Sequence, residues 1–377
     1  MSRRVLITVG EVSGDRNAAQ FAQRLMELAP DCRIDGLGGP AMRQAGVTVH
    51  HDTVSRSAMG LRALLRAVEV KRLLNWTTEY YQKTPPDLHV CVDSWAMNCH
   101  FAMLAKRFKI PVLYYIAPQA WASRPGRVKK MRKCVDELAC ILPFEQQWFA
   151  SRGVPTRFVG HPLFDHVAPI VVAAEKPLGY PPVVGILPGS RKSIARHNFP
   201  RQLDVAALLA AEIPGIRFLI ATTPNTDAIV REELAHRNLT TNFTVELDGF
   251  DHLVPQCDLC LTVSGTATLH VAAYNIPMII VYRGSWLAWN LLGRWIISAR
   301  TFGMVNILSP DGRHIAPEFI PWNGSVKPVA DCALDFLANP AKLIDQRRRL
   351  VGMIAPLAAG GASRKTAELA LELIGRE

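Results

Sequence analysis

The chain has 377 residues, of which 49% are hydrophobic, and this length supports two domains that each bury a core of their own. No apolar run reaches the roughly 18–20 residues of a transmembrane helix. The formal net charge of +11 excludes a strongly acidic protein and predicts an anionic partner: a nucleotide, a nucleic acid or an acidic membrane surface.

The N-terminal apolar run is interpreted as a strand and not as a signal peptide. Residues 5–10 are too few for the core of such a peptide, and Glu11 and Asp15 follow at once. We expect the eight cysteines to be reduced, mostly buried thiols of a cytoplasmic protein.

The first half of the chain alternates short apolar runs with helical patterns. Strands are predicted at residues 5–10, 33–37, 47–50, 88–92, 112–116, 137–142 and 157–159. The segments between them predict helices, which makes a parallel, doubly wound sheet.

Two junctions of this half are candidate ligand sites. The loop from Glu11 through Ser13 and Gly14 to Asp15 joins a strand to a helix, where ligands commonly bind; the alternative is a helix start capped by Ser13 or Asp15. Asp93 directly follows the strand 88–92. A carboxylate there serves as a general base if it reaches a substrate hydroxyl, or else caps the helix that follows.

Two basic segments are also ambiguous. Residues 59–76 form a basic amphipathic pattern, which suits either an anionic bilayer or a helix packed on the sheet with a solvated basic face. The basic run 124–133 is either a solvated helix face or an attractant for phosphorylated substrates and lipid headgroups.

The second half begins after a proline-rich linker at residues 171–182. Strands are predicted at residues 183–187, 217–221, 244–247, 259–263 and 278–282. The domains are therefore residues 1–170 and 183–345, each Rossmann-like, and residues 346–377 are predicted helices that pack back on the first domain.

Two turns of the second half are typical of anion binding. Pro188-Gly189-Ser190-Arg191 follows a strand and offers backbone amides and a permanent charge to a diphosphate; the alternative is an ordinary turn with a surface arginine. Ser264-Gly265-Thr266 opens a helix, whose N-terminus binds anions, or is a plain N-cap. Two such turns in one domain favour the functional interpretation.

A tryptophan-rich apolar stretch at residues 283–298 predicts a helix that lies either at a lipid boundary or in the core or a domain interface.

Nine motifs, taken in order along the chain, resemble the lipid-A-disaccharide synthase family. They are Gly10-Glu11-Val12-Ser13-Gly14-Asp15, Gly38-Gly39-Pro40, Ala58-Met59-Gly60, Pro118 to Trp121 with Arg124, Leu142-Pro143-Phe144-Glu145, Phe158-Val159-Gly160-His161-Pro162, Leu187-Pro188-Gly189-Ser190-Arg191, Ser264-Gly265-Thr266-Ala267 and Val281-Tyr282-Arg283. Each motif is weak by itself; the ordered set covers nearly the whole chain.

The resemblance implies a GT-B glycosyltransferase: two Rossmann-like domains with parallel sheets facing across a cleft, peripheral on the inner membrane and often dimeric. It implies a UDP-sugar donor and an acylated glucosamine phosphate acceptor, with inversion and with neither metal nor cofactor.

The resemblance also assigns roles. Asp93 and Arg191 are the implied catalytic residues. Implied donor-binding residues are Gly189, Ser190, Arg191, Ser264, Gly265, Thr266, His270 and Asn306. Implied acceptor-binding residues are Glu11, Ser13, Gly14, Asp15 and Asn98. Acyl chains or membrane are expected to contact Met59, Leu61, Leu64, Leu65, Trp286 and Trp289.

The chain departs from the family pattern in three places. His270 replaces the glutamate that binds the ribose hydroxyls, and a single imidazole contact replaces a bidentate one. Residues 95–97 lack the further aspartate found before the asparagine, and Arg62 replaces a glutamate.

Three other functions stay open from the sequence. A related GT-B enzyme acts on another UDP-sugar, as a transferase or an epimerase. A catalytically impaired, membrane-associated protein binds a nucleotide without turning it over. A nucleic-acid binder fits the charge, but the basic and aromatic clusters lack the pattern of a recognition module, so we expect no nucleic-acid partner.

Overall fold

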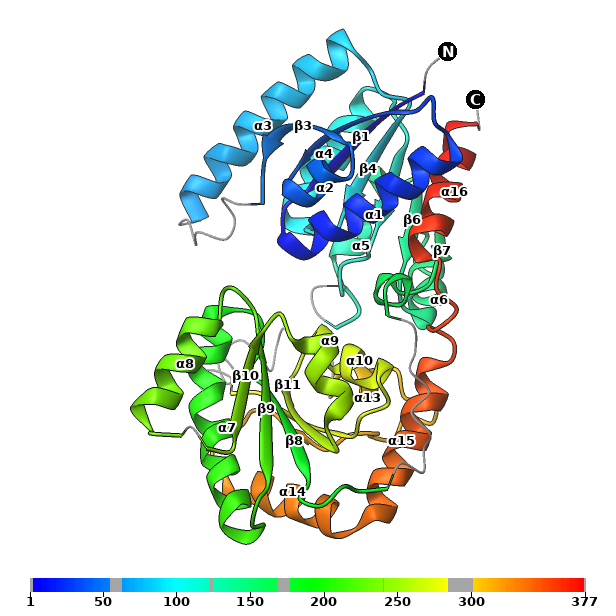
Figure 1. Cartoon of the computed structure of the whole chain (residues 1–377). Helices are drawn as coiled ribbons and strands as arrows, with labels where there is room; N and C mark the ends of the chain where they lie inside the picture. Colours follow the sequence, from blue (N-terminus) through cyan, green and yellow to red (C-terminus); the bar gives the residue numbers. More distant parts are fainter. Residues whose placement is uncertain are drawn as a thin grey trace. The chain divides into compact units, whose positions relative to one another are not determined.

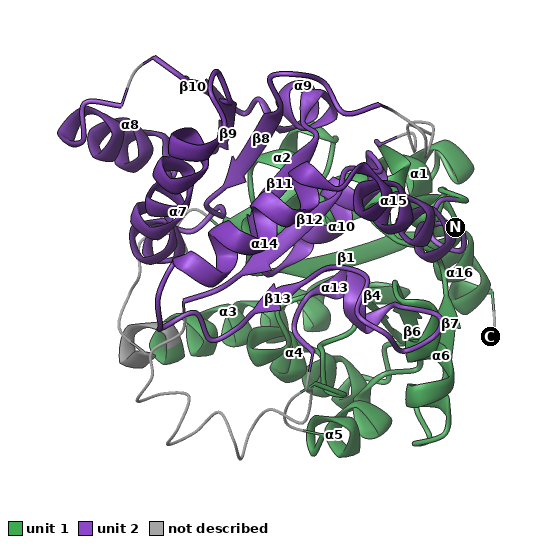
Figure 2. Cartoon of the chain, turned by 90° about the horizontal axis from the view of Figure 1, so that it is seen from below, with its two compact units in different colours: residues 1–166, 359–377 green, residues 167–358 purple. Residues whose placement is uncertain are grey.

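The computed structural model describes residues 3–54, 63–122, 125–167, 177–239, 241–283 and 301–375, with the backbone alone at residues 63–66. The chain divides into two compact units, Met1–His166 with Ala359–Glu377 and Val167–Ala358 (Figure 2). The predicted grouping of residues 346–377 therefore differs from this division, because residues 346–358 belong to the second unit.

Unit 1 is a seven-stranded parallel sheet in the order β3-β2-β1-β4-β5-β6-β7 (Figure 1). Its strands are β1 (Arg4–Val9), β2 (Arg33–Gly38), β3 (Thr48–Asp52), β4 (Leu88–Val92), β5 (Val112–Tyr115), β6 (Glu137–Cys140) and β7 (Thr156–Phe158). Its helices are α1 (Val12–Leu28), α2 (Pro40–Gln44), α3 (Ala63–Lys83), α4 (Trp95–Arg107), α5 (Arg127–Cys134), α6 (Pro143–Ala150) and α16 (Ala362–Ile374).

Unit 2 is a six-stranded parallel sheet in the order β10-β9-β8-β11-β12-β13. Its strands are β8 (Val183–Leu187), β9 (Arg217–Thr222), β10 (Phe243–Leu247), β11 (Leu259–Val263), β12 (Met278–Val281) and β13 (Glu318–Phe319). Its helices are α7 (Lys192–Glu212), α8 (Asp227–His236), α9 (Phe250–Leu253), α10 (Thr266–Ala273), α13 (Met304–Ile307), α14 (Lys327–Ala338) and α15 (Pro340–Ile354).

The parallel, doubly wound arrangement predicted for both halves is confirmed. Twelve of the strands coincide with predicted runs, because continuous apolar stretches suit strands covered on both faces. The two-residue strand β13 was not predicted, since it is too short to leave an apolar pattern.

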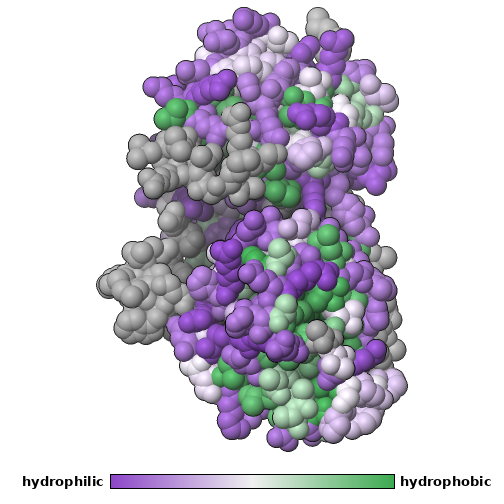
Figure 3. All heavy atoms as spheres, turned by 60° about the vertical axis from the view of Figure 1, so that its left-hand side comes forward, coloured by the Kyte–Doolittle hydropathy of each residue, from purple (hydrophilic) through white to green (hydrophobic). Residues whose placement is uncertain are grey.

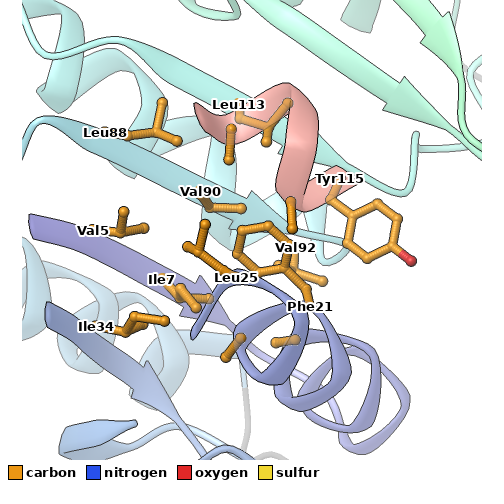
Figure 4. Packing of buried hydrophobic residues seen from close by; sticks show 14 of the residues in the cluster. Val5, Ile7, Phe21, Leu25, Ile34, Leu88, Val90, Val92, Leu113 and Tyr115 are labelled. Carbon is orange, nitrogen blue, oxygen red and sulfur yellow. The ribbon is translucent and has the colours of Figure 1, made fainter. Parts of the chain in front are cut away.

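Alternate residues of β1 enter different cores of unit 1. Val5, Ile7 and Val9 pack with α1 and α16 (Figure 4), and Leu6 packs on the opposite face with α4. Helix α16 contributes Ala367 and Leu373 to the first core. A buried leucine is worth about 1.5–3 kcal/mol, so this last helix is part of the stability of unit 1.

The eight cysteines are free thiols, seven of them buried and Cys332 half-buried, as predicted. Cys257 and Cys260 form a C-x-x-C pair packed under β8. A Cβ on Gly185 would lie only 2.6 Å from the Cys260 sulfur, so the strand needs glycine there.

Hydrophilic residues cover much of the described surface on the face shown in Figure 3. Within the described ranges, none of the helices combines the length and the apolar character needed to cross a bilayer.

Candidate functional site

Each unit has one point at which the strand order reverses. In unit 1 this point lies between β1 and β4, where Val9 pairs with Val92. In unit 2 it lies between β8 and β11, where Leu187 pairs with Thr262. Open α/β sheets bind ligands beyond the carboxyl ends of the strands at such points.

The segment Glu11–Asp15 is mostly helix and not loop, because α1 begins at Val12 with Glu11 in the N-cap position. Glu11 and Ser13 are exposed at the end of β1. The predicted N-cap role of Ser13 or Asp15 is wrong, since no side chain caps this helix.

The Asp15 carboxylate caps a different helix. It is 2% exposed and accepts hydrogen bonds from the backbone N–H groups of Gly39 (2.8 Å), Ala41 (2.9 Å) and Met42 (3.3 Å) at the start of α2. A carboxylate at a helix N-terminus satisfies amides that lack a partner within the helix. Asp15 therefore joins α1 to α2, and its oxygens are occupied by the protein itself.

Gly14 brings the start of α1 close to Asp93. A Cβ placed on Gly14 would lie 2.5 Å from a methyl group of Val9 and 3.6 Å from the Cβ of Asp93. Only glycine allows this approach of the helix to the strand ends. The two predicted sites of the first half, at Glu11–Asp15 and at Asp93, are thus neighbours at the switch point.

Asp93 and Ser94 both have left-handed backbone conformations, with φ of 51° and 45°. Such conformations cost of order 1 kcal/mol or more for a residue with a Cβ, and they persist where the surroundings enforce them. The half-buried Asp93 carboxylate accepts a hydrogen bond from the Ser94 N–H at 2.7 Å. The alternative of a simple helix cap is not what forms, because no side chain caps α4.

Asn98 lies underneath Asp93 and contacts the backbone. It is fully buried, and its amide group donates to the carbonyl oxygens of Val92 and Asp93 at 2.9 Å each and of Thr8 at 3.2 Å. Its side-chain oxygen accepts from the Thr8 hydroxyl at 2.8 Å. These partners occupy the groups that were predicted to bind the acceptor.

In unit 2, Gly189 has a φ of +95°, and a Cβ there would lie 2.9 Å from a methyl group of Val263 in β11. The turn therefore requires glycine twice over, for its conformation and for its contact. Ser190 and Arg191 are exposed just beyond it, and Arg191 stands in the N-cap position of the 21-residue helix α7. Backbone amides and a guanidinium thus lie together at a helix N-terminus, an arrangement suited to a diphosphate.

The second anion-type turn lies at the end of the neighbouring strand. Gly265 has a φ of +145° with no atom within 4 Å of an added Cβ, and α10 begins at Thr266. Gly265 and Thr266 are exposed, and the Ser264 hydroxyl donates to the carbonyl of Phe302 at 2.9 Å. The two turns flank one switch point.

Asn306 resembles Asn98 in its surroundings. It is 5% exposed, and its side-chain oxygen accepts from the N–H groups of Ile315 (2.7 Å) and Ala316 (2.8 Å). Its amide group donates to the Glu318 carboxylate at 2.7 Å and to the Ala316 carbonyl at 2.8 Å. All of its hydrogen-bonding groups contact the protein itself, and its implied role in donor binding stays a prediction.

Glu318 contacts the same segment, and no pattern in the sequence predicted its role. Its carboxylate accepts from the N–H groups of Phe302 (3.1 Å) and Gly303 (2.7 Å), directly beside the carbonyl that Ser264 contacts. These contacts join residues that are 12–16 positions apart in an irregular segment, so no helix or strand pattern in the sequence predicts them.

His270 is stacked between two aromatic rings. Its ring centroid lies 4.1 Å from that of Phe250 and 5.5 Å from that of Tyr274, and its Nε2 lies 2.7 Å from the Asp251 carboxylate. Burial lowers the pKa of His270, with Asp251 opposing the shift. The Tyr274 hydroxyl donates to the same carboxylate at 2.7 Å.

Known proteins that resemble this chain point to one family. The family model described as lipid-A-disaccharide synthetase matches residues 5–368. Two curated relatives are lipid-A-disaccharide synthases of Geobacter metallireducens, 35% identical over 100% of this chain and 98% of its own length, and of Coxiella burnetii, 30% identical over 99% of both.

The chain belongs to the lipid-A-disaccharide synthetase family. It is therefore a glycosyltransferase of lipid A biosynthesis.

Solved structures place this family member in the GT-B fold class. A UDP-GlcNAc 2-epimerase from Neisseria meningitidis, determined with UDP-GlcNAc bound, has a TM-score of 0.63 at 13% identity and covers 98% of this chain and 100% of its own. The glycotransferase of kitacinnamycin has a TM-score of 0.61 at 14% identity, with 98% of both chains covered. At these identities the likeness shows the fold alone.

Most of the residues expected to contact acyl chains or membrane lie outside the residues that the structure describes. Met59, Leu61, Trp286 and Trp289 lie outside the described residues, and Leu64 and Leu65 fall where only the backbone of α3 is described.

Proposed function

We propose that this glycosyltransferase transfers 2,3-diacylglucosamine from its UDP donor to the 6-hydroxyl of 2,3-diacylglucosamine 1-phosphate, with inversion. The products are lipid A disaccharide 1-phosphate and UDP. Family membership supports the substrates. The observation that supports the mechanism is that Asp93 and Arg191 each stand at the switch point of their unit.

Asp93 acts in this proposal as the general base. Its carboxylate takes the proton of the acceptor hydroxyl as the oxygen attacks the anomeric carbon, and the bond to UDP breaks from the opposite side. The left-handed backbone at Asp93 and Ser94 supports this role, because strain held by surrounding contacts gathers at functional sites.

Arg191 and the amides after Gly189 stabilise the leaving group. The diphosphate gains negative charge as the glycosidic bond breaks, and fixed donors at a helix N-terminus stabilise that charge more in the transition state than in the bound donor. The guanidinium supplies the positive charge for which many enzymes use a metal ion.

We also propose that the chain works at the cytoplasmic surface of the inner membrane. Helix α3 supports this, since Val68 is 67% exposed and lies beside the exposed Lys71 and Arg72. An apolar side chain beside cations suits the surface of an anionic bilayer. The homodimer implied by the resemblance stays a prediction.

The test is a product assay by mass spectrometry with UDP-diacylglucosamine and the diacylglucosamine 1-phosphate acceptor. We expect the disaccharide product, and we expect Asp93→Asn to lower turnover by about 10³-fold or more while the protein stays folded. The matched control is Asp248→Asn. Asp248 is also an aspartate with a φ of 54° directly after a parallel strand, but it follows β10 at the sheet edge.

Three results would contradict the proposal. Near-normal turnover in Asp93→Asn would show that Asp93 is not the general base. Transfer from another UDP-sugar, or epimerisation of one, identifies a related enzyme instead. Binding of UDP with no product indicates an impaired nucleotide binder.

A further inference from the structure

The carbonyl oxygen of Asp93 receives two side-chain hydrogen bonds from different elements. Asn98 in α4 donates to it at 2.9 Å, and the Tyr114 hydroxyl in β5 donates at 2.5 Å. The Asp93 N–H donates to the carbonyl of Tyr115 at 2.9 Å. A carbonyl oxygen has two lone pairs, so the backbone of Asp93 is held on both sides with nothing left to satisfy.

Asn98 is itself oriented by a buried chain of three side chains. Its side-chain oxygen accepts from Thr8, whose hydroxyl oxygen lies 2.9 Å from His89 Nε2, and His89 Nδ1 contacts the Tyr81 hydroxyl. Thr8, His89 and Asn98 are fully buried, and Tyr81 is 2% exposed.

The direction of every proton in this chain follows from chemistry. An amide oxygen only accepts, so the Thr8 hydroxyl donates to Asn98 and its oxygen accepts from His89 Nε2–H. The neutral imidazole then accepts at Nδ1 from the Tyr81 hydroxyl. Burial lowers the pKa of His89 to about 3, in agreement with a neutral ring.

This series of hydrogen bonds does not carry protons to the active site. It ends in N–H donors of Asn98 that contact backbone carbonyls, and an amide passes no proton onward at neutral pH. What it does is supply a donor to the Asn98 side-chain oxygen, so that this oxygen and the three backbone carbonyls that accept from the Asn98 nitrogen together hold the amide in one orientation.

We infer that Tyr114 and Asn98 are positioning residues for the Asp93 carboxylate, and that Thr8, His89 and Tyr81 hold Asn98 in the orientation this requires. The inference rests on the proposed role of Asp93 as general base. Two consecutive left-handed residues relax when their contacts are removed, and a carboxylate that moves by an ångström loses its geometry with the acceptor hydroxyl.

The test compares Tyr114→Phe with Tyr115→Phe in the full-length chain. Both tyrosines are fully buried in β5, and both variants lose one hydroxyl; Tyr115 points to the opposite face of the sheet, toward α1 and α16 (Figure 4). We expect Tyr114→Phe to lower kcat about tenfold with the donor KM unchanged, and Tyr115→Phe to keep kcat. Thermal melting measures whether the two variants lose similar stability.

A second pair probes the buried chain. Thr8→Val removes the hydroxyl at nearly the same volume and is expected to lower kcat about tenfold, whereas Thr8→Ser keeps the hydroxyl and restores it. If Thr8→Val fails to fold, Tyr81→Phe, which removes the hydroxyl at the other end of the same set of contacts, takes its place. Wild-type kcat in a folded variant of either kind contradicts the role of these buried side chains.

The outcomes separate this inference from the proposed function. Loss of turnover in Asp93→Asn with equal kcat in Tyr114→Phe and Tyr115→Phe overturns the positioning role and leaves the general base in place. Near-normal turnover in Asp93→Asn overturns both. In the Asp93→Asn background, Tyr114→Phe is expected to cause no further loss, and a further tenfold loss contradicts the inference.

Discussion

The two switch points occupy the same place in similar sheets but present different chemistry. In unit 1, Asn98 and Tyr114 both donate hydrogen bonds to the carbonyl of Asp93, a residue with a left-handed backbone and a carboxylate side chain. In unit 2, the exposed residues Ser190, Arg191 and Thr266 stand on two glycine turns at helix N-termini. The proposed mechanism accounts for this difference, because a general base must be aimed at one proton, whereas a diphosphate is bound by several donors.

The comparison also shows how asparagine works in both units. Asn98 and Asn306 were each expected to bind a ligand, and each is buried with its donors and acceptor directed at the protein frame. An amide group pairs with carbonyl and N–H at once, which suits it to hold an irregular segment in place.

The largest effect outside Asp93 is expected at Arg191. Arg191→Ala should lower kcat by about 10²–10³-fold, because the charge on the leaving diphosphate loses its fixed partner. Arg191→Lys should recover only part of this, since an ammonium does not reproduce the guanidinium fork. Steady-state kinetics with varied donor measures it, with the exposed Arg196→Ala in the same helix as control. A change confined to the donor KM would show that Arg191 binds the donor equally well in the ground state and the transition state. The proposed difference in chemistry between the two switch points would then be wrong.

Removal of either asparagine should destabilise one unit and spare the other. Asn98→Ala and Asn306→Ala each leave several polar groups unpaired, at a cost of about 2–4 kcal/mol in the free energy of unfolding. Hydrogen exchange followed by mass spectrometry should show faster exchange in β4 and α4 for the first and near residues 302–318 for the second. Normal exchange with a raised donor KM in Asn306→Ala would instead make Asn306 a ligand contact.

The smallest effect concerns pH and a carboxylate of unit 1. Glu145 is 1% exposed and accepts from Trp121 Nε1 at 2.9 Å and from the Leu142 N–H at 3.2 Å; burial raises its pKa to about 7. The folded state therefore keeps a proton that the unfolded chain releases near pH 4.3, and stability present below that pH is lost as the pH rises to 7.

The full shift of this pKa is worth about 3–4 kcal/mol in the free energy of unfolding, of which about 2–3 kcal/mol is lost between pH 5 and pH 8. Glu145→Gln removes the titration, so denaturant unfolding at pH 5 and pH 8 should give the variant a flatter pH dependence than the wild type. Glu79→Gln, on the exposed side of α3, serves as control. If the stability of Glu145→Gln and of the wild type changed in parallel with pH, the Glu145 carboxylate would be charged over the whole range from pH 5 to pH 8.

Local sequence determined the strands, the class of fold and the candidate turns. Apolar β-branched runs such as Val183–Leu187 give strands wherever both faces are covered. Gly189 indicates a turn by itself, because glycine readily adopts a positive φ. The position of Asp93 at a strand end followed from the same pattern, so the site could be found before its contacts were known.

Only the tertiary structure decided which of those residues are exposed and which are buried and bonded to the protein itself. Asp15 caps α2, Asn98 contacts β1 and β4, and Asn306 joins Glu318, all through partners that are distant along the chain or reached across irregular segments. A polar residue has the same appearance in a sequence whether its donors meet substrate or backbone. The difference arises when strands far apart in the chain become neighbours in a sheet and bury the side chains between them.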